Sequence, residues 1–485
     1  MISQIFFDDY WLPELIISTT LTLSIIFLER KNPKSAYAWI LLVWIKPLLG
    51  FVLYLFFSQN LTRRKIYKYN ATENNAYHVA MDLDPHMSLD RAKLAHLPHH
   101  RTIEYHMNAS SAYYSSNNDI ILITDGHEKF DALFDAIEKA KTSIHLEYYI
   151  FKNDTIGTAL MDLLIKRAKD GIDVRLLTDE MGSFLFNTKK VKELQAAGGH
   201  YGRFFPSKIR FLNPRINYRC HRKIVVIDGQ IGFIGGFNVG DEYLGENKKM
   251  GYWRDTHLRV TGSVVHELQH RFILDWQTTG KTLTEHTTIK SMKSYYPTST
   301  QTEGVGAQLV VSGPDSILSH IKHGFLRMIS GASKHIYIQT PYFVPDESIM
   351  EALKIALASG IDVFIMIPNK PDHIFIYWAT LSHIGELIEC GAKVYIYNNG
   401  FLHAKVITVD DQVSSVGTCN FDIRSFSLNF ESNLFIYDEK IASDLRETFL
   451  MDIEDALYYD IKTYTNRSRA IKMKESVSRL VSPLL

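Results

Sequence analysis

Residues 221–238 read HRKIVVIDGQIGFIGGFN, and residues 403–420 read HAKVITVDDQVSSVGTCN. Counted from the histidine of each stretch, a lysine stands at +2, an aspartate at +7, a glycine at +14 and an asparagine at +17. The residues at these positions are His221, Lys223, Asp228, Gly235 and Asn238 in the first stretch, and His403, Lys405, Asp410, Gly417 and Asn420 in the second. A single pattern of this kind is a weak signal, because chance produces it in some chains. Two matching five-point patterns in one chain indicate a duplicated functional unit.

The segments around the two stretches repeat one order of elements. An apolar run typical of a strand is followed by an amphipathic helical run and by a second apolar run that opens with GIDV. These runs cover residues 143–151, 158–170 and 171–179 in the first copy, and 335–343, 348–359 and 360–368 in the second. The order strand, helix, strand predicts an α/β fold, and its return predicts an internal duplication.

Length and composition agree with two copies and limit the classes of function. A chain of 485 residues exceeds what one hydrophobic core usually organises. Lys+Arg and Asp+Glu are both 53, so no global basic field recruits nucleic acid, and an anion site must be local. Three cysteines, Cys220, Cys390 and Cys419, argue against a disulfide framework and for a reducing compartment.

The first sixty residues differ from the rest. Two apolar runs, 11–28 and 36–57, are close to the length that spans a bilayer, and the polar turn ERKNPKS separates them. The sequence therefore predicts an N-terminal transmembrane helical hairpin and a multi-pass protein of the cell membrane. Lys46 and Pro47 interrupt the second run, which leaves a shallow or re-entrant hairpin open. Basic residues within 63–68 favour a cytoplasmic location for the catalytic domains.

The remaining boundaries follow from changes in composition. A polar stretch with little periodicity predicts a connector, whose His99 and His100 are expected to be solvated rather than metal ligands. A Thr-rich and turn-rich stretch separates the two copies. The predicted segments are a hairpin at 1–60, a connector at 61–118, a first domain at 119–277, a linker at 278–306 and a second domain at 307–485 that ends in a basic helix.

The spacing of the repeated residues suggests chemistry. On a strand, residues i and i+2 point to one face, so each histidine shares a face with its lysine. If the two strands meet where the copies join, the lysines and the amides of Asn238 and Asn420 can hold phosphate oxygens. One histidine can then act as nucleophile and the other as acid and base. No metal site is predicted, because such a site needs closely spaced carboxylates or cysteines.

The doubled pattern resembles the phospholipase D superfamily, and within it the chain is similar to the bacterial cardiolipin synthase family. The similarity covers essentially the whole chain and rests on the segments RKNPKSAYAW, HLEYYIF, INYRCHRKIVVIDG, YWRDTHLRVTG, QTPYFVPD, FLHAKV, GTCNFDIRSFSLNFE and ESVSRLVSPLL. The resemblance implies duplicated α-β-α sandwich domains, each a mixed sheet flanked by helices. It also implies that His221 attacks phosphorus and that His403 protonates the leaving alcohol.

The resemblance extends to the residues that support the two histidines. An acidic residue downstream in each copy, Asp255 in the first and Glu431 in the second, is implied to hold the other ring nitrogen of its own copy's histidine. Such a tether fixes the tautomer and favours the cation. Asp228 and Asp410 are expected to be structural, either in turns or as partners across the copies.

Four arginines near these residues are candidates for binding the anionic lipid: Arg219, Arg222, Arg254 and Arg424. Ion pairs that only support the fold are the alternative for each. The C-terminal stretch NRSRAIKMKESVSRLV places Met473, Val477, Leu480 and Val481 on one helical face. It could lie on anionic lipid or be a solvated terminal helix.

The resemblance leaves the exact reaction to be decided among related activities. The family reaction transfers a phosphatidyl group from one phosphatidylglycerol to another, giving cardiolipin and glycerol. It needs no nucleotide, and the chain has no GxxxxGK[ST] loop, so no cofactor is predicted. A phospholipase D hydrolase, a phosphatidylserine-type synthase and a non-enzymatic tether are the alternatives. Phosphatidylglycerol and anionic membrane lipid are the predicted partners, and a homo-oligomer is left open.

Overall fold

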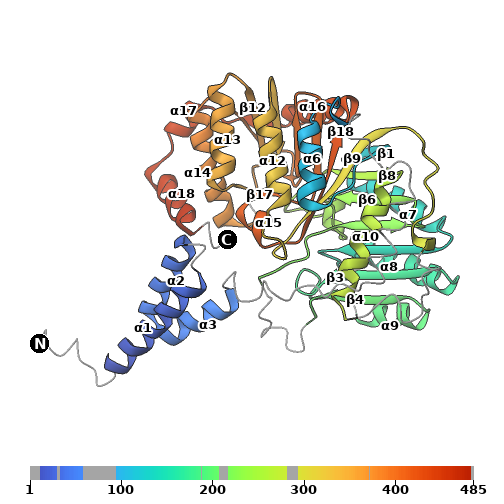
Figure 1. The fold of residues 1–485 in the computed structure, drawn as a ribbon, viewed down its shortest axis with the longest axis horizontal. Helices are drawn as coiled ribbons and strands as arrows, with labels where there is room; N and C mark the ends of the chain where they lie inside the picture. Colours follow the sequence, from blue (N-terminus) through green and yellow to red (C-terminus); the bar gives the residue numbers. More distant parts are fainter. Residues whose placement is uncertain are drawn as a thin grey trace, which may run out of the picture. The chain divides into compact units, whose positions relative to one another are not determined.

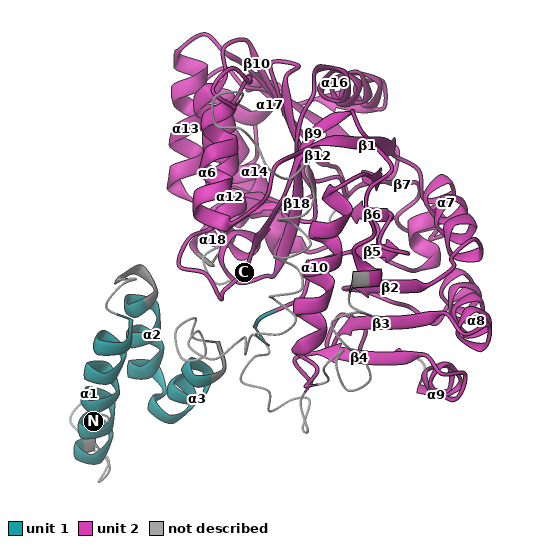
Figure 2. Cartoon of the chain, turned by 45° about the vertical axis from the view of Figure 1, so that its right-hand side comes forward, with its two compact units in different colours: residues 1–67, 207–218 teal, residues 68–206, 219–485 magenta. Residues whose placement is uncertain are grey.

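The computed structural model of the chain describes residues 11–29, 33–57, 94–186, 188–206, 217–280, 293–370 and 372–481 (Figure 1). The chain forms two compact units (Figure 2): residues 1–67 with 207–218, and residues 68–206 with 219–485. Much of the expected connector 61–118 and of the linker 278–306 lies outside the described residues. The described part of the connector includes helix α6 (His100–Ser110).

In the described residues, the smaller unit contains three helices: α1 (Trp11–Leu28), α2 (Pro33–Ile45) and α3 (Pro47–Phe57). Proline is favoured at the first helical position because its missing N–H needs no partner there, so α3 starts at Pro47. The second apolar run is therefore two short helices rather than one long helix. Ile25, Trp39 and Val43 are buried among these helices. Within the described residues, we find no helix with both the length and the apolar character needed to cross a membrane.

The larger unit repeats one succession of elements. In the first copy it comprises β1 (Ser115–Ile123), α7 (Gly126–Glu138), β2 (Ser143–Tyr148), α8 (Thr155–Lys169), β3 (Asp173–Asp179), α9 (Thr188–Ala196), β4 (His200–Phe204), β5 (Ile224–Ile227), β6 (Ile231–Gly235), η3 (Asp241–Leu244), β7 (Trp253–Arg254), β8 (His257–Thr261) and α10 (Val264–Gln277), followed by η5 (Lys293–Tyr295). In the second copy it comprises β9 (Val305–Ser312), α12 (His320–Gly331), β10 (His335–Gln339), β11 (Phe343–Val344), α13 (Glu347–Ala358), β12 (Asp362–Pro368), α14 (Ile374–Glu389), β13 (Lys393–Tyr397), β14 (Phe401–Leu402), β15 (Val406–Val409), β16 (Val413–Gly417), β17 (Phe421–Asp422), α15 (Ile423–Ser427), β18 (Glu431–Tyr437), α16 (Glu439–Glu454) and β19 (Ala456–Tyr458). The last helices of the described residues are α17 (Ile461–Thr465) and α18 (Arg469–Val481).

One mixed sheet joins the copies. In the described part of the chain it has fifteen strands in the order β19-β13-β12-β10-β15-β16-β18-β9-β1-β8-β6-β5-β2-β3-β4. The order runs outward from the central pair β1 and β9 in matching sequence, so corresponding strands occupy corresponding places. Strands β1 and β9 are antiparallel, with Ser115 opposite Ala307. The predicted duplication and the mixed α/β fold are confirmed.

The strand-helix-strand units form because apolar strands alternate with amphipathic helices. Strands β2 and β3 are parallel, as are β10 and β12, and α8 and α13 connect them. Asp154 caps α8 by accepting from the Gly157 N–H at 3.2 Å, and Asp346 caps α13 by accepting from the Ile349 N–H at 3.2 Å. Figure 2 shows α10 on one side of strands β2 to β4 and α7, α8 and α9 on the other. The sheet is thus covered by helices on both faces, as the sandwich prediction requires.

Candidate active site

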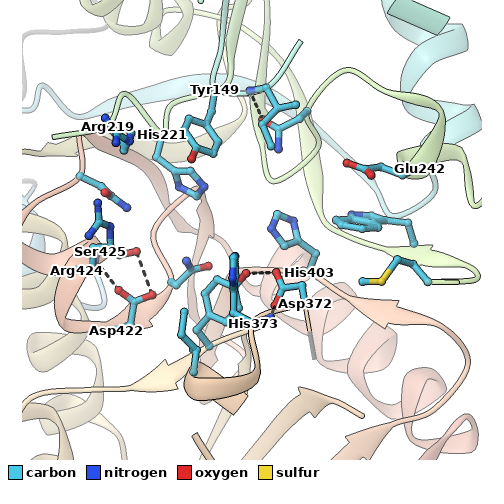
Figure 3. Close-up of a pocket in the computed structure, with 18 of the residues that line it drawn as sticks. Tyr149, Arg219, His221, Glu242, Asp372, His373, His403, Asp422, Arg424 and Ser425 are labelled. Atoms are coloured by element: carbon cyan, nitrogen blue, oxygen red, sulfur yellow. Dashed lines mark hydrogen bonds between the residues drawn. The ribbon is translucent and has the colours of Figure 1, made fainter. Parts of the chain in front are cut away.

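A cavity of about 630 Å³ opens between the two copies, within the larger unit. Both repeated histidines and both repeated asparagines line it: His221, His403, Asn238 and Asn420. Figure 3 shows the two imidazoles projecting into this cavity from opposite copies. The structure therefore brings the two halves of the sequence pattern into one site.

The histidines lie in extended segments that enter strands, rather than on the strands themselves. His221 precedes β5, and His403 stands between β14 and β15. Each segment is held by the other copy: the His221 N–H donates to the Phe430 carbonyl at 2.9 Å, and the His403 N–H donates to the Arg254 carbonyl at 2.7 Å. Backbone pairing across the copies therefore fixes where each imidazole stands.

The carboxylates that hold the histidines are exchanged between the copies. Nδ1 of His221 lies 2.9 Å from Oε2 of Glu431, and Nδ1 of His403 lies 2.6 Å from Oδ2 of Asp255. The expected pairing within each copy is therefore wrong. The physical reason is the backbone pairing, because Phe430 and Arg254 directly precede the two acids and bring them to the opposite histidine.

This arrangement sets the protonation of both rings. A carboxylate next to Nδ1 favours a proton there, which leaves the Nε2 lone pair available to a substrate. Burial lowers the pKa of His221, against the opposing effect of Glu431. Burial, with the charge of Lys405, lowers the pKa of His403 to about 4. Burial thus favours the neutral form of both imidazoles in the free protein.

The two tethering carboxylates are buried but supported as anions. Burial opposes their ionisation, yet the neighbouring histidines lower the pKa of both Glu431 and Asp255. The Thr418 hydroxyl donates to Oε2 of Glu431 at 2.5 Å, and the Asn429 amide donates to Oε1 at 3.1 Å. Asp255 accepts from the Thr256 N–H at 2.7 Å. Each carboxylate can therefore stay charged and stabilise an imidazolium that forms during a reaction.

The two lysines lie behind the histidines rather than among the residues that line the cavity. The Lys223 ammonium donates to the His221 carbonyl at 2.6 Å, and the Lys405 ammonium donates to the His403 carbonyl. Burial lowers the pKa of Lys223 to about 7 and that of Lys405 to about 8. An anion that enters the cavity would favour their charged forms.

The two asparagines differ in their partners. Oδ1 of Asn238 accepts from the Ile150 N–H at 3.1 Å, and its amide donates to the Tyr243 hydroxyl at 3.0 Å. Oδ1 of Asn420 is buried without a hydrogen-bond partner among the described residues. Asn238 is thus fixed in place by first-copy groups, whereas Asn420 has an acceptor left for a ligand.

The four candidate arginines separate into two pairs. Arg219 and Arg424 line the cavity. Arg222 and Arg254 do not line it, because Arg222 forms a buried ion pair with Asp275 at 2.6 Å and Arg254 forms one with Asp452 at 2.9 Å. The ion pairs of Arg222 and Arg254 support the fold, which was the alternative to lipid binding for each arginine.

Asp228 and Asp410 have structural partners within their own copies. Asp228 accepts hydrogen bonds from the N–H groups of Lys141, Thr142 and Ser143. Asp410 accepts from the corresponding N–H groups at the start of β10, those of Ser333, Lys334 and His335. Both aspartates have a positive φ, 54° and 55°, in the turns after β5 and β15. Both aspartates thus lie in turns and accept hydrogen bonds from backbone groups of their own copy.

Sequence reasoning missed several residues of the cavity wall. The Tyr149 ring is 5.0 Å from the His221 ring, and the Trp253 ring is 5.2 Å from the His403 ring. Glu242, Asp372 and His373 also line the cavity (Figure 3). Tyr149 and Trp253 fall in quoted family segments, which was the available signal. The loop before α14 had no such signal.

One group in the described part of the chain has ligand atoms close enough for a metal: Glu147, Cys220 and Asp275, all within 4.8 Å of one another. The Cys220 thiol donates to Glu147 at 2.7 Å. Burial raises the pKa of Glu147 to about 8, which favours its protonated form. Asp275 is held in ion pairs by Arg222 and Arg271. A cation would have to compete with two guanidinium groups there.

Comparisons with known proteins agree with this site. A family model described as "Cardiolipin synthase, PLD-like domain" matches residues 133–276 and 325–453, and one described as "Phospholipase_D-nuclease N-terminal" matches residues 16–59. The chain is 48% identical to the major cardiolipin synthase ClsA of Bacillus subtilis (strain 168), over 97% of this chain and 98% of the relative. It is 43% identical to a cardiolipin synthase of Staphylococcus aureus (strain Mu50), over 100% of this chain and 98% of that relative. A solved phosphatidylserine synthase of Haemophilus influenzae Rd KW20 shares the fold, with a TM-score of 0.61, 14% identity, and coverage of 79% of this chain and 100% of that chain.

The duplicated fold and the paired histidines are those of the phospholipase D superfamily. Within it, the chain belongs to the cardiolipin synthase family with phospholipase D-like domains. The family predicted from the sequence is therefore confirmed.

Proposed function

We propose that the chain transfers the phosphatidyl group of one phosphatidylglycerol to another, which gives cardiolipin and glycerol, through a phosphatidyl-histidine intermediate on His221. The observation that supports it is the pair of imidazoles in one cavity, each with a carboxylate at Nδ1. This leaves one Nε2 for attack on phosphorus and one for proton transfer.

The first half of the reaction forms the covalent intermediate. Nε2 of His221 attacks phosphorus, the bond from phosphorus to the glycerol oxygen breaks, and the proton on Nε2 of His403 passes to that oxygen. His403 must bind a proton before this step. The negative charge of a bound phosphodiester and the Asp255 carboxylate at 2.6 Å both favour its cation.

The second half regenerates the enzyme. His403 takes the proton of a headgroup hydroxyl on the second phosphatidylglycerol, and the freed oxygen attacks phosphorus. The bond from phosphorus to Nε2 of His221 breaks, which restores the neutral imidazole and leaves His403 protonated for the next cycle. Lys223, Lys405 and the asparagine amides are proposed to stabilise the phosphoryl oxygens during both halves.

The charges on the cavity wall suggest where each substrate lies. Arg219 and Arg424 line the cavity and can receive the phosphate of the second, anionic lipid. Glu242 and Asp372 line it as well. Carboxylates accept hydrogen bonds from hydroxyl groups, so we place the departing glycerol beside Asp372.

We also propose that the α1 to α3 unit anchors the enzyme in the cell membrane as a hairpin, shallow or re-entrant at the break before Pro47. Large apolar side chains on these helices are exposed, including Phe27 at 71% and Leu48 at 72%. Such side chains are stable in lipid and not in water. The basic residues of 63–68 support a cytoplasmic catalytic unit.

Membrane orientation can be tested with Cys390, which is the exposed cysteine among the described residues. A membrane-impermeant maleimide should label it in inverted vesicles and not in intact cells. We further propose the domain limits expected from the sequence: a connector at 61–118, a first domain at 119–277, a linker at 278–306 and a second domain at 307–485.

Product analysis tests the proposed reaction. The purified full chain is reconstituted in vesicles of phosphatidylglycerol that is labelled in the terminal glycerol and in the acyl chains. One glycerol should be released for each cardiolipin formed. Release of glycerol with phosphatidic acid as the sole lipid product would contradict transfer and indicate the hydrolase instead.

A further inference from the structure

The C-terminal helix α18 packs with a polar side inward. Glu475 and Ser478 are only 4% and 2% exposed, and Glu475 forms an ion pair with Arg467 at 3.1 Å. Met473 and Leu480, by contrast, are 66% and 81% exposed, and Val477 is exposed as well. Positions i, i+4 and i+7 share one helical face, so these three side chains form an apolar stripe on the outer face of α18.

Helix α18 thus buries polar side chains and exposes apolar ones, which is the reverse of the orientation expected for a helix surrounded by water. A helix on the surface of a soluble domain buries its apolar side chains and leaves carboxylates in solvent. Burial of Glu475 with exposure of Met473, Val477 and Leu480 indicates that the outer face of α18 meets an apolar surface in the working protein.

The charges around the stripe indicate what that surface is. Lys472 and Lys474 stand on either side of Met473, and Arg469 adds a further positive charge to the helix. Arg479 forms an ion pair with Glu386 on α14. The one acidic residue in the sequence of α18 is the buried Glu475. An apolar stripe flanked by basic residues is typical of a helix that lies in the interface of an anionic bilayer.

Helix α18 packs against α14, the helix that contributes Ile376 to the wall of the active-site cavity. The Lys474 ammonium lies 5.1 Å from the Trp378 ring on α14. One turn earlier on α14, Ile374 and Phe375 are 65% and 58% exposed, and Ile376 lines the cavity. Exposed apolar side chains thus occur both on the outer face of α18 and at the end of α14 that reaches the cavity wall.

We propose that Met473, Val477 and Leu480 of α18, with Ile374 and Phe375 of α14, form a docking surface that seats the catalytic unit on anionic lipid. We call these five residues the bilayer face. This inference rests on the proposed function for its purpose, because docking would let phosphatidylglycerol pass from the bilayer into the cavity without crossing water.

The depth of spin labels in a membrane tests the bilayer face in the full chain. Single cysteines replace Met473 or Leu480 in a Cys390→Ser background, and Met451→Cys is the matched control because Met451 is 62% exposed on α16. Each nitroxide is exposed to oxygen, which concentrates in lipid, and to a water-soluble nickel chelate. We expect phosphatidylglycerol vesicles to raise oxygen access and lower chelate access at 473 and 480, and to change neither at 451.

The other outcomes name other occupants and would overturn the proposal. Labels at 473 and 480 that stay as accessible to the chelate as the label at 451 would mean that the outer face of α18 remains in water. Labels that are already shielded in lipid-free detergent would mean that the chain covers the stripe itself. Spin–spin broadening between labels, with or without lipid, would mean that a second copy covers it.

Turnover separates this inference from the reaction. The double variant Met473→Asp with Leu480→Asp should lose roughly tenfold of its turnover on phosphatidylglycerol vesicles and little in detergent micelles, because charged side chains resist insertion. Met451→Asp should match the parent in both. Equal turnover of the double variant and the parent on vesicles would contradict docking. A lipid product other than cardiolipin would contradict the proposed reaction while the spin-label result still decided docking.

Discussion

His221 and His403 share one cavity, but the proposed reaction gives them different tasks. His221→Asn should form no phosphatidyl-enzyme and show no turnover, because an amide is a poor nucleophile at phosphorus. His403→Asn removes the proton donor and acceptor, so the intermediate that does form should persist. Labelled phosphatidylglycerol, rapid quenching and peptide mapping would measure this. Label mapped to His403 would reverse the assignment of the two roles.

The exchanged carboxylates give a second test of the same roles. Glu431→Gln should slow formation of the intermediate on His221, whereas Asp255→Asn should slow its breakdown through His403. Neutral replacements of such a carboxylate cost roughly 10² to 10⁴ in turnover, because they weaken the stabilisation of the imidazolium and allow the wrong tautomer. Single-turnover kinetics separate the two steps. If Glu431→Gln instead accumulated the intermediate, the step assigned to each pair would be wrong.

The buried lysines predict an alkaline limit to activity. An ammonium is charged below its pKa, and burial lowers the pKa of Lys223 to about 7 and of Lys405 to about 8. As pH rises through this range, the free enzyme loses positive charge behind the phosphate site. A bound phosphodiester raises both pKa values, so kcat/KM should fall between about pH 7 and about pH 9 while kcat falls less. A flat kcat/KM profile across this range would contradict the prediction.

The sequence predicted the residues of the site better than their connections. The repeated spacing identified both histidine and lysine pairs, and the family resemblance pointed to Asp255 and Glu431. The exchange was not predictable from spacing, because His221 and Glu431 are 210 positions apart and meet only through pairing between the copies. Arg222 and Arg254 stand next to site residues in sequence, yet their side chains form ion pairs away from the cavity.

The two strand-to-strand turns provide a structural control for the site. Asp228→Ala removes an acceptor for three backbone N–H groups at the start of β2, which should lower the free energy of unfolding by about 1–3 kcal/mol. Asp228→Asn keeps an acceptor oxygen and tolerates the positive φ, so it should lose less. Thermal denaturation in detergent measures both. A loss of turnover per folded molecule at 25 °C would show that Asp228 also serves the reaction.

The longer helices and strands could be predicted from the periodicity of their sequences, whereas the shortest strands could not. Strands β2, β3, β10 and β12 have apolar sequences that indicate their place in a covered sheet. Strands β7 and β14 have two residues each and form only because the copies pair there. Their sequences contain too little local information to predict them, although they position His403.

The complete molecule should control the fate of its own intermediate. Any hydroxyl can attack a phosphatidyl-histidine, so transfer exceeds hydrolysis only where lipid is the nearest acceptor. Dilution of phosphatidylglycerol with detergent should shift the product from cardiolipin toward phosphatidic acid, and added glycerol should return cardiolipin to phosphatidylglycerol. Thin-layer separation of labelled lipids measures both. A product ratio independent of lipid dilution would show that the protein alone excludes water.

The exchange of carboxylates between the copies has a historical consequence. A gene that encoded one copy could not have completed a tethered histidine within one chain, because each acid serves the histidine opposite. If the ancestral copies exchanged their acids in the same way, two chains had to assemble before either histidine was held, and their association preceded the fusion of the genes. Once the copies shared one gene, selection could act on each separately, which allowed the two imidazoles to diverge into attacker and proton carrier.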